Sequence, residues 1–168
     1  MMDEILAPAV QVHDFFRREH LTLAVAESCT GGLISHWITA LPGASTFFKS
    51  GVIAYSAESK VSILGIDGET LSTYGAVSVE IAREMAEKVR RLAATDFSLS
   101  TTGNLGPGAM EMKDKGLIYI AVCCTGETFS KELRLKGDRT RNKEHAAREA
   151  LEFLVKKAGE VCAGSRNE

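Results

Sequence analysis

Several features that mark specialised classes of protein are scarce or absent in this chain. Its four cysteines lack both the density of a disulfide scaffold and the spacing of a zinc site. The longest uninterrupted apolar run, Leu117–Cys124, is too short to cross a bilayer. The net charge of −2 at pH 7 provides no general basic surface for nucleic acid. These absences exclude a disulfide-rich scaffold and a membrane-spanning helix, and they disfavour a nucleic-acid binder.

Length and composition predict one globular domain over residues 1–168. Hydrophobic residues make up 45% of the sequence and charged residues 25%, which is typical of a chain that buries a full core. The acidic segment Met1–Glu4 does not have the layout of a signal peptide, so we expect a cytoplasmic protein. We expect residues 1–4 and 159–168 to fray.

The spacing of apolar residues alternates between helical and strand periods along the chain. It predicts helices at 5–19, 33–40, 56–64, 78–92 and 139–158, strands at 22–26, 47–55, 97–101, 116–124 and 128–134, and a loop at 65–75. In the helix that Ser78 caps, the residues expected to be buried are Ile81, Ala82, Met85, Ala86, Val89 and Leu92.

The order of these elements predicts an α/β fold. The first three strands alternate with helices, which favours parallel strands with helices on both faces. The last two strands are joined only by Thr125-Gly126-Glu127, so they pair antiparallel. The expected architecture is a three-layer α/β/α sandwich around a mixed five-stranded sheet.

The stretch 21–32 runs from an apolar strand into a turn rich in hydroxyl groups and glycine. Such a strand-to-helix turn directs free backbone N–H groups past the end of the strand, where an anion is favoured. Ser28 and Thr30 can cap the following helix, contact a ligand or, for one of them, attack it. Cys29 is a minor rival nucleophile, because a helix N-terminus can acidify a thiol.

A second turn of this kind, 101–108, follows the third strand. If the first and third strands are neighbours, the two turns face each other across one crevice. Tyr55 and Lys60 follow the second strand and can lean toward the same crevice. A buried lysine with a lowered pKa can activate a serine without a metal or a histidine, although from spacing alone an exposed surface lysine is the simpler interpretation of Lys60.

Five blocks of this sequence, in order, resemble the CinA C-terminal-domain family. The matching residues are 26–32, 51–56 with Lys60, 74–78, 102–103 with 106–108, and 137–139. The resemblance implies the family's three-layer fold, with the sheet order 2-1-3-4-5 and strand 4 antiparallel. The family includes the nicotinamide-nucleotide amidohydrolases, which deamidate nicotinamide mononucleotide to nicotinate mononucleotide and ammonia. The resemblance therefore implies this activity or, alternatively, a non-catalytic nucleotide-binding or regulatory module of the competence/damage-inducible type.

On the matching positions, the resemblance also implies roles for individual residues. Ser28 would be the nucleophile, Lys60 the general base and Tyr55 a hydrogen-bonding partner in the same pocket. We expect the N–H groups of the Cys29–Gly32 turn to stabilise the oxyanion, and the glycine-rich turns, or Arg139 or Arg141, to bind the substrate phosphate. The substrate-binding residues would be Cys29, Thr30, Gly31, Gly32, Thr102, Gly103, Gly106, Gly108 and Arg139.

The same resemblance implies a pyridine mononucleotide as the small-molecule partner, no metal and no cofactor, and a homo-oligomer, a dimer, as the assembly. The sequence departs from the family pattern at Ala57, where the family has asparagine, at Lys143, where a second arginine often stands, and in the loop 104–115. These departures leave the substrate open. Basic residues between Lys131 and Lys143 suggest nucleic-acid binding as a weaker alternative, but no aromatic platform accompanies them.

Overall fold

The strands of the computed structural model form one mixed sheet. The structure describes residues 2–108 and 110–165, with side chains from Leu6 onward. The strands are β1 (Leu23–Glu27), β2 (Phe48–Ile53), β3 (Phe97–Gly103), β4 (Leu117–Cys124) and β5 (Glu127–Arg134). Their order is β2-β1-β3-β4-β5, where β1 is parallel to β2 and β3, and β4 is antiparallel to both of its neighbours. The predicted sheet order and the reversed fourth strand are confirmed.

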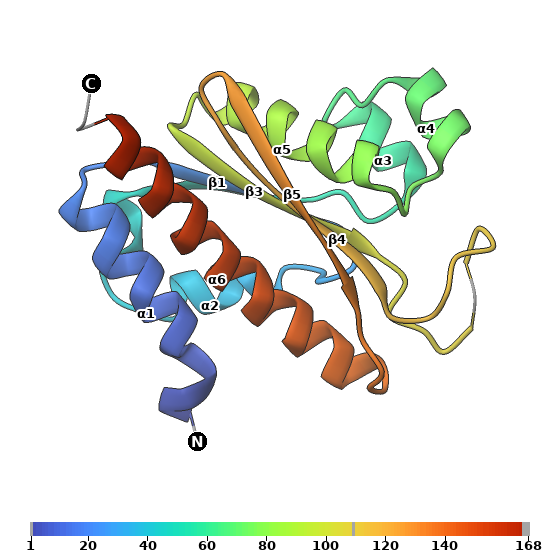
Figure 1. The fold of residues 1–168 in the computed structure, drawn as a ribbon, viewed down its shortest axis with the longest axis horizontal. Coiled ribbons are helices and arrows are strands. Elements are labelled where there is room, and N and C mark those ends of the chain that lie inside the picture. Colours follow the sequence, from blue (N-terminus) through green and yellow to red (C-terminus); the bar gives the residue numbers. More distant parts are fainter. Residues whose placement is uncertain (1, 109, 166–168) are drawn as a thin grey trace.

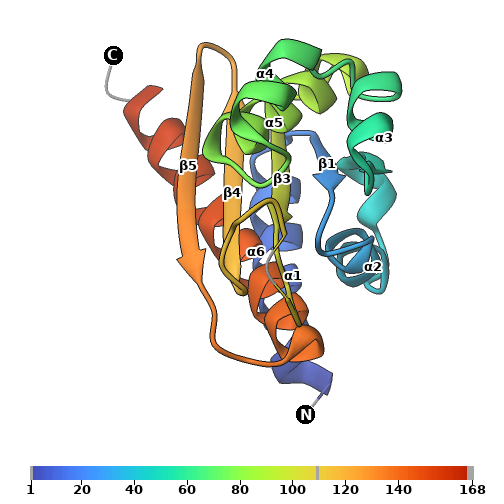
Figure 2. The ribbon, with the colours of Figure 1, turned by 90° about the vertical axis from the view of Figure 1, so that its right-hand side faces the viewer.

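Helices cover both faces of this sheet, which gives the predicted three layers (Figures 1 and 2). One face carries α1 (Met2–Arg18), α2 (Leu33–Thr39) and α6 (Arg139–Ser165), and the other carries α3 (Ala57–Ser62), α4 (Gly68–Tyr74) and α5 (Val79–Ala93). A short 3-10 helix, η1 (Ala44–Thr46), precedes β2. No helix within the described residues is both long enough and apolar enough to cross a membrane.

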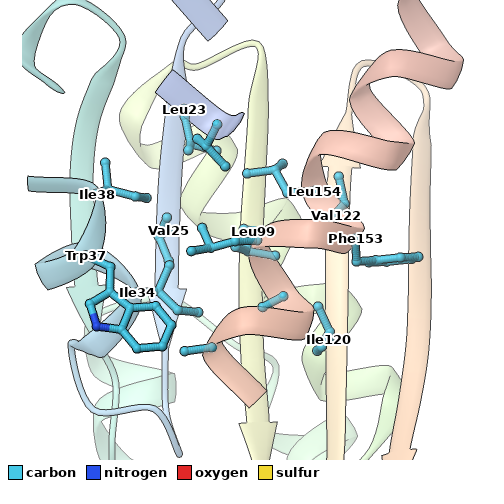
Figure 3. Close-up of a cluster of buried hydrophobic side chains, with 14 of the residues drawn as sticks. Leu23, Val25, Ile34, Trp37, Ile38, Leu99, Ile120, Val122, Phe153 and Leu154 are labelled. Atoms are coloured by element: carbon cyan, nitrogen blue, oxygen red, sulfur yellow. The ribbon is translucent and has the colours of Figure 1, made fainter. Parts of the chain in front are cut away.

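The two faces of the sheet bury side chains of different size. Large apolar side chains such as Val25 and Leu99 point toward α2 and α6, where they pack with Trp37 and Leu154 (Figure 3). The opposite face presents smaller residues to α5, and the hydroxyl groups of Ser98 and Ser100 donate to carbonyls of that helix at 2.6 and 2.5 Å. This pairing lets α5 lie close to the sheet while the buried hydroxyl groups keep hydrogen-bond partners.

Two predictions about individual helices are wrong. Residues 65–75 are not all loop, because Asp67 caps α4 by accepting hydrogen bonds from the N–H and hydroxyl of Thr70 at 2.8 and 2.9 Å. Leu92 of α5 is 63% exposed, whereas the other five residues predicted on its buried face are buried.

The last helix is longer than expected. Instead of fraying at residue 159, α6 continues to Ser165, and Val161 and Cys162 pack against the large apolar core. At the other end, α1 already begins at Met2. The remaining residues predicted to fray, 1 and 166–168, lie outside the described residues.

Candidate active site

The register of the three parallel strands brings their carboxyl ends to one edge of the sheet. Glu27, the last residue of β1, pairs with Ile53 of β2 and with Thr101 of β3. Ser28 therefore emerges between the segments that follow β2 and β3, and its N–H donates to the Thr101 carbonyl at 3.0 Å. The Ser28 side chain lies at the predicted crevice.

Lys60 reaches Ser28 from α3, on the other side of this edge. A capping box fixes the start of α3, because the hydroxyl groups of Ser56 and Ser59 each accept a hydrogen bond from the other's backbone N–H at 3.1 Å. Lys60, one residue further on, is only 1% exposed, and its Nζ lies 2.8 Å from Ser28 Oγ. The interpretation of Lys60 as a surface lysine is wrong.

The surroundings of the Lys60 amine favour its neutral form. Burial lowers its pKa, because a charged ammonium loses water there, and the nearby Glu111 carboxylate opposes this effect only in part. Two backbone carbonyls, of Ala54 at 3.0 Å and of Tyr55 at 3.4 Å, accept hydrogen bonds from Nζ. In a neutral amine, these carbonyls take both N–H bonds, and the lone pair is then free to face the Ser28 hydroxyl.

Cys29 is not an activated thiol. Its side chain is 6% exposed, and burial raises the pKa of the thiol to about 12, although the Thr101 hydroxyl and the Lys60 charge pull it down. The thiol therefore stays protonated at neutral pH. The expectation that the start of α2 acidifies Cys29 is wrong, and Ser28 has no thiolate rival at this position.

A buried carboxylate already occupies the N-terminus of α2. Glu27 is fully buried, and its two oxygens accept hydrogen bonds from the N–H groups of Gly32, Ile34 and Ser35 at 2.8–3.1 Å. They also accept from the hydroxyl groups of Thr30 at 2.7 Å and Ser35 at 2.8 Å. These donors are not available to a ligand, which corrects the expectation of a free anion site at this helix start.

Only part of the Ser28 turn can act as an oxyanion hole. Gly31 donates its N–H to the Ser28 carbonyl at 3.1 Å, and Gly32 donates to Glu27. Within the described residues, the N–H groups of Cys29 and Thr30 donate to no other residue. Thr30 is fully buried and does not line the cavity beside Ser28, so the oxyanion donors expected from the whole turn are reduced to the N–H of Cys29.

Two hydroxyl groups predicted to bind substrate hold the framework instead. Thr30 is fully buried, and its hydroxyl bonds to Glu27 and to the Thr101 hydroxyl. Thr102 donates its hydroxyl to the Ala76 carbonyl at 2.6 Å, which ties β3 to the segment before α5. Neither side chain lines the cavity beside Ser28.

The turn after β3 is organised by Asn104, a residue for which the sequence predicts no role beyond its place in the loop 104–115. Its carboxamide accepts a hydrogen bond from the Gly106 N–H at 3.0 Å and donates to the Gly108 carbonyl at 2.8 Å. Asn142 of α6 is equally buried and donates to the Leu105 carbonyl at 3.2 Å. Two buried asparagines therefore fix this turn against the start of α6.

These segments enclose a cavity of about 90 Å³ beside Ser28. Tyr55 and Arg139 meet at its mouth, where Arg139 donates from Nη2 to the Tyr55 hydroxyl at 2.7 Å and from Nη1 to the Gly106 carbonyl at 2.7 Å. Tyr55 is 57% exposed. The lining residues are Ser28, Cys29, Tyr55, Gly103, Asn104, Leu105, Met110 and Arg139.

Other hollows of the molecule do not involve these groups. A cavity of about 420 Å³ is larger but is lined by residues at the opposite end of the sheet, including Phe97 and Cys124. Arg141 lies beside Asp138 at 3.6 Å and lines a separate hollow with Trp37, so it is not brought to the Ser28 cavity. Within the described residues, no group of three or more histidine, cysteine, aspartate or glutamate side chains is arranged to hold a metal ion.

Comparisons with known proteins agree with this architecture. Residues 6–158 match the family model described as the CinA C-terminal domain. A CinA-like protein of Kosmotoga olearia is 46% identical over 144 residues, which cover 85% of this chain and 35% of that protein. The chain thus spans about a third of the length of this relative.

Solved structures match the chain over nearly its whole length. The competence damage-inducible protein A of Klebsiella pneumoniae superposes with a TM-score of 0.90 at 29% identity, covering 92% of this chain and 97% of that one. The competence/damage inducible protein CihA of Agrobacterium tumefaciens superposes with a TM-score of 0.86 at 34% identity, covering 90% and 93%.

Proposed function

The chain belongs to the CinA C-terminal-domain family, and on that premise we propose that it is an amidohydrolase that deamidates nicotinamide mononucleotide to nicotinate mononucleotide and ammonia. The observation that carries this proposal is the 2.8 Å contact between Lys60 Nζ and Ser28 Oγ at a buried position. A serine hydroxyl is a poor nucleophile until a base takes its proton, and a desolvated lysine is such a base.

The first step is attack of Ser28 Oγ on the carboxamide carbon. Neutral Lys60 accepts the hydroxyl proton, and the resulting ammonium keeps the Ala54 and Tyr55 carbonyls as hydrogen-bond acceptors. The C=O double bond becomes a C–O⁻ single bond, and the N–H group of Cys29 donates to this oxyanion. The negative charge that forms on the substrate oxygen therefore lies beside a backbone N–H that has no other acceptor among the described residues.

The second step splits the carbon–nitrogen bond. The tetrahedral intermediate collapses, and the leaving amine takes the proton from Lys60 and departs as ammonia, which leaves an ester on Ser28. Water then attacks this ester while Lys60 accepts a proton from it. Return of that proton to Ser28 Oγ releases the carboxylic acid product and restores both side chains.

The size of the cavity fits one end of such a substrate. Its volume of about 90 Å³ is far below the 300–1,000 Å³ of pockets that enclose a whole drug-sized ligand. The carboxamide-bearing ring enters beside Ser28, and the ribose phosphate lies outside, near the exposed Tyr55 ring and Arg139.

The test is release of ammonia from nicotinamide mononucleotide. We expect wild-type protein to release ammonia and Ser28→Ala to release none, while the matched Ser72→Ala, on the exposed surface of α4, keeps wild-type activity. Circular dichroism and the melting temperature establish that each variant is folded. If folded wild-type protein is stabilised by the mononucleotide but releases no ammonia, the proposal fails and a non-catalytic nucleotide-binding module takes its place.

A further inference from the structure

The phosphate of a mononucleotide needs positive charge or free donors, and the glycine-rich turns of this site offer few. Gly31 donates its N–H to Ser28, Gly32 to Glu27 and Gly106 to Asn104. Because an internal carboxylate already fills the start of α2, a second anion there would be repelled. The remaining candidates for binding the phosphate are the positively charged side chains around the cavity.

Arg139 is the cation that lines the cavity itself. Its guanidinium donates to two neutral acceptors, the Tyr55 hydroxyl and the Gly106 carbonyl. A guanidinium has five N–H donors, so three remain for a ligand. No carboxylate within the described residues forms an ion pair with Arg139, so its charge is not neutralised.

Lys143 stands one helical turn further along α6 and reaches the turn after Ser28. Its Nζ would lie 3.3 Å from a Cβ added to Gly31, so the amine rests directly over this glycine. The side chain is half-buried, and within the described residues it has neither a hydrogen bond nor an ion pair. An unpaired ammonium is thus held between α6 and the nucleophile's turn.

The position of these two cations on α6 is electrostatically unfavourable without a ligand. The Asp138 carboxylate, directly before α6, accepts the Arg141 N–H at 2.9 Å and already offsets the partial positive charge of this helix start. Arg139 and Lys143, however, are like charges four residues apart on a helix, and such charges repel each other. An anion bound between Arg139 and Lys143 would remove this repulsion.

We propose that Arg139 and Lys143 form the binding site for the phosphate monoester of the substrate, a site that rests on the proposed function for the identity of the rest of the ligand. The carboxamide end lies in the cavity at Ser28, and the phosphate lies at its mouth between the two cations. Lys143 acts there as a point charge where an arginine would bind bidentately. The site selects nucleotides over the corresponding nucleosides.

The test compares ligands that differ only in the phosphate. Binding of nicotinamide mononucleotide, nicotinamide riboside and inorganic phosphate is measured by calorimetry with Ser28→Ala protein, which does not turn over the ligand. A second substitution, Lys143→Gln, is expected to weaken mononucleotide binding about ten-fold or more and to leave riboside binding unchanged. Lys143→Arg is expected to restore it, and Lys156→Gln, an exposed lysine near the other end of α6, is the charge-matched control.

Each result decides for or against the site. Equal mononucleotide affinity in the Lys143→Gln and Lys156→Gln proteins overturns the proposal. So does tighter binding of the riboside than of the mononucleotide to the Ser28→Ala protein, or a failure of both the mononucleotide and inorganic phosphate to bind. Binding of either phosphate compound that depends on Lys143 supports it. If that dependence is found while wild-type protein releases no ammonia, the phosphate site stands and the proposed amidohydrolase activity falls.

Discussion

Replacement of Lys60 by methionine tests the proposed chemistry most directly. Methionine fills a similar apolar volume but has no amine, so Ser28 Oγ loses the base 2.8 Å away. General-base catalysis contributes about 10²- to 10⁴-fold to a rate, which corresponds to about 3–5 kcal/mol of transition-state free energy. We expect kcat for ammonia release to fall by at least that factor, with KM changed little, because Lys60 does not line the cavity.

Two comparisons separate a base from a merely structural lysine. In Lys60→Arg the side chain keeps a positive charge but cannot lose its proton near neutral pH, so this variant is expected to be as inactive as Lys60→Met. Because Ser28 and Lys60 act as one unit, the double variant Ser28→Ala with Lys60→Met is expected to be no slower than the slower single variant. Additive losses in kcat would contradict a shared mechanism.

The pH dependence of the rate and of the folding stability also tests the role of Lys60 as the base. Burial lowers the Lys60 pKa, so the neutral fraction, and with it the rate, rises with pH until the amine is deprotonated. In the window between this lowered pKa and the ordinary lysine value, the unfolded chain binds more protons than the folded one, so the stability of the wild type rises with pH. The Lys60→Met variant lacks that slope. A Lys60→Met protein that keeps more than a tenth of wild-type activity would show that Lys60 is not the general base.

Three further outcomes follow from the burial of individual side chains. Cys29→Ala is expected to keep activity within a few-fold in the ammonia assay, and Cys29 to resist iodoacetamide at pH 8, because its thiol pKa is raised to about 12; rapid labelling would contradict this. Glu27→Gln, which points an amide N–H group at existing donors, is expected to lower the free energy of unfolding in urea by about 2–4 kcal/mol. Leu92→Ala is expected to change it by less than about 0.5 kcal/mol, whereas Ile81→Ala on the buried face of α5 costs about 2–5 kcal/mol.

The sequence predicted the sheet but not every helix, for a physical reason. Strands and long helices bury a face, so their apolar spacing is visible in the sequence. The short helix α4 has no fully buried side chain and packs against the core through the half-buried Leu71, so its clearest signal is the Asp67 cap. Leu92 continues the helical spacing of α5 but is exposed. The spacing shows which face of a helix is apolar, but it does not show where the surface that covers this face ends.

The residues of the candidate site could be predicted from local patterns, but their contacts could not. The turn after the first strand and the position of Lys60 make both residues candidates, and the resemblance implies their roles, but their contact depends on the register of β1 and β2 and on the start of α3. Glu27 stands next to Ser28 in the sequence, yet its role depends on donors supplied by α2 in three dimensions. The contact between Arg139 and Tyr55 joins residues that are 84 positions apart, which no local pattern reveals.

The departure at Ala57 is explained by how α3 is built. Ala57 is exposed in the first turn, and the capping box uses Ser56 and Ser59, so an asparagine at this position is not needed to start the helix. What the helix must do is aim Lys60 inward, and this costs stability because an amine is removed from water. The carbonyl groups of Ala54 and Tyr55, which directly follow β2, offset that cost by accepting hydrogen bonds from the Lys60 amine. The burial that makes Lys60 a base and the acceptors that make the burial tolerable therefore come from the same short segment.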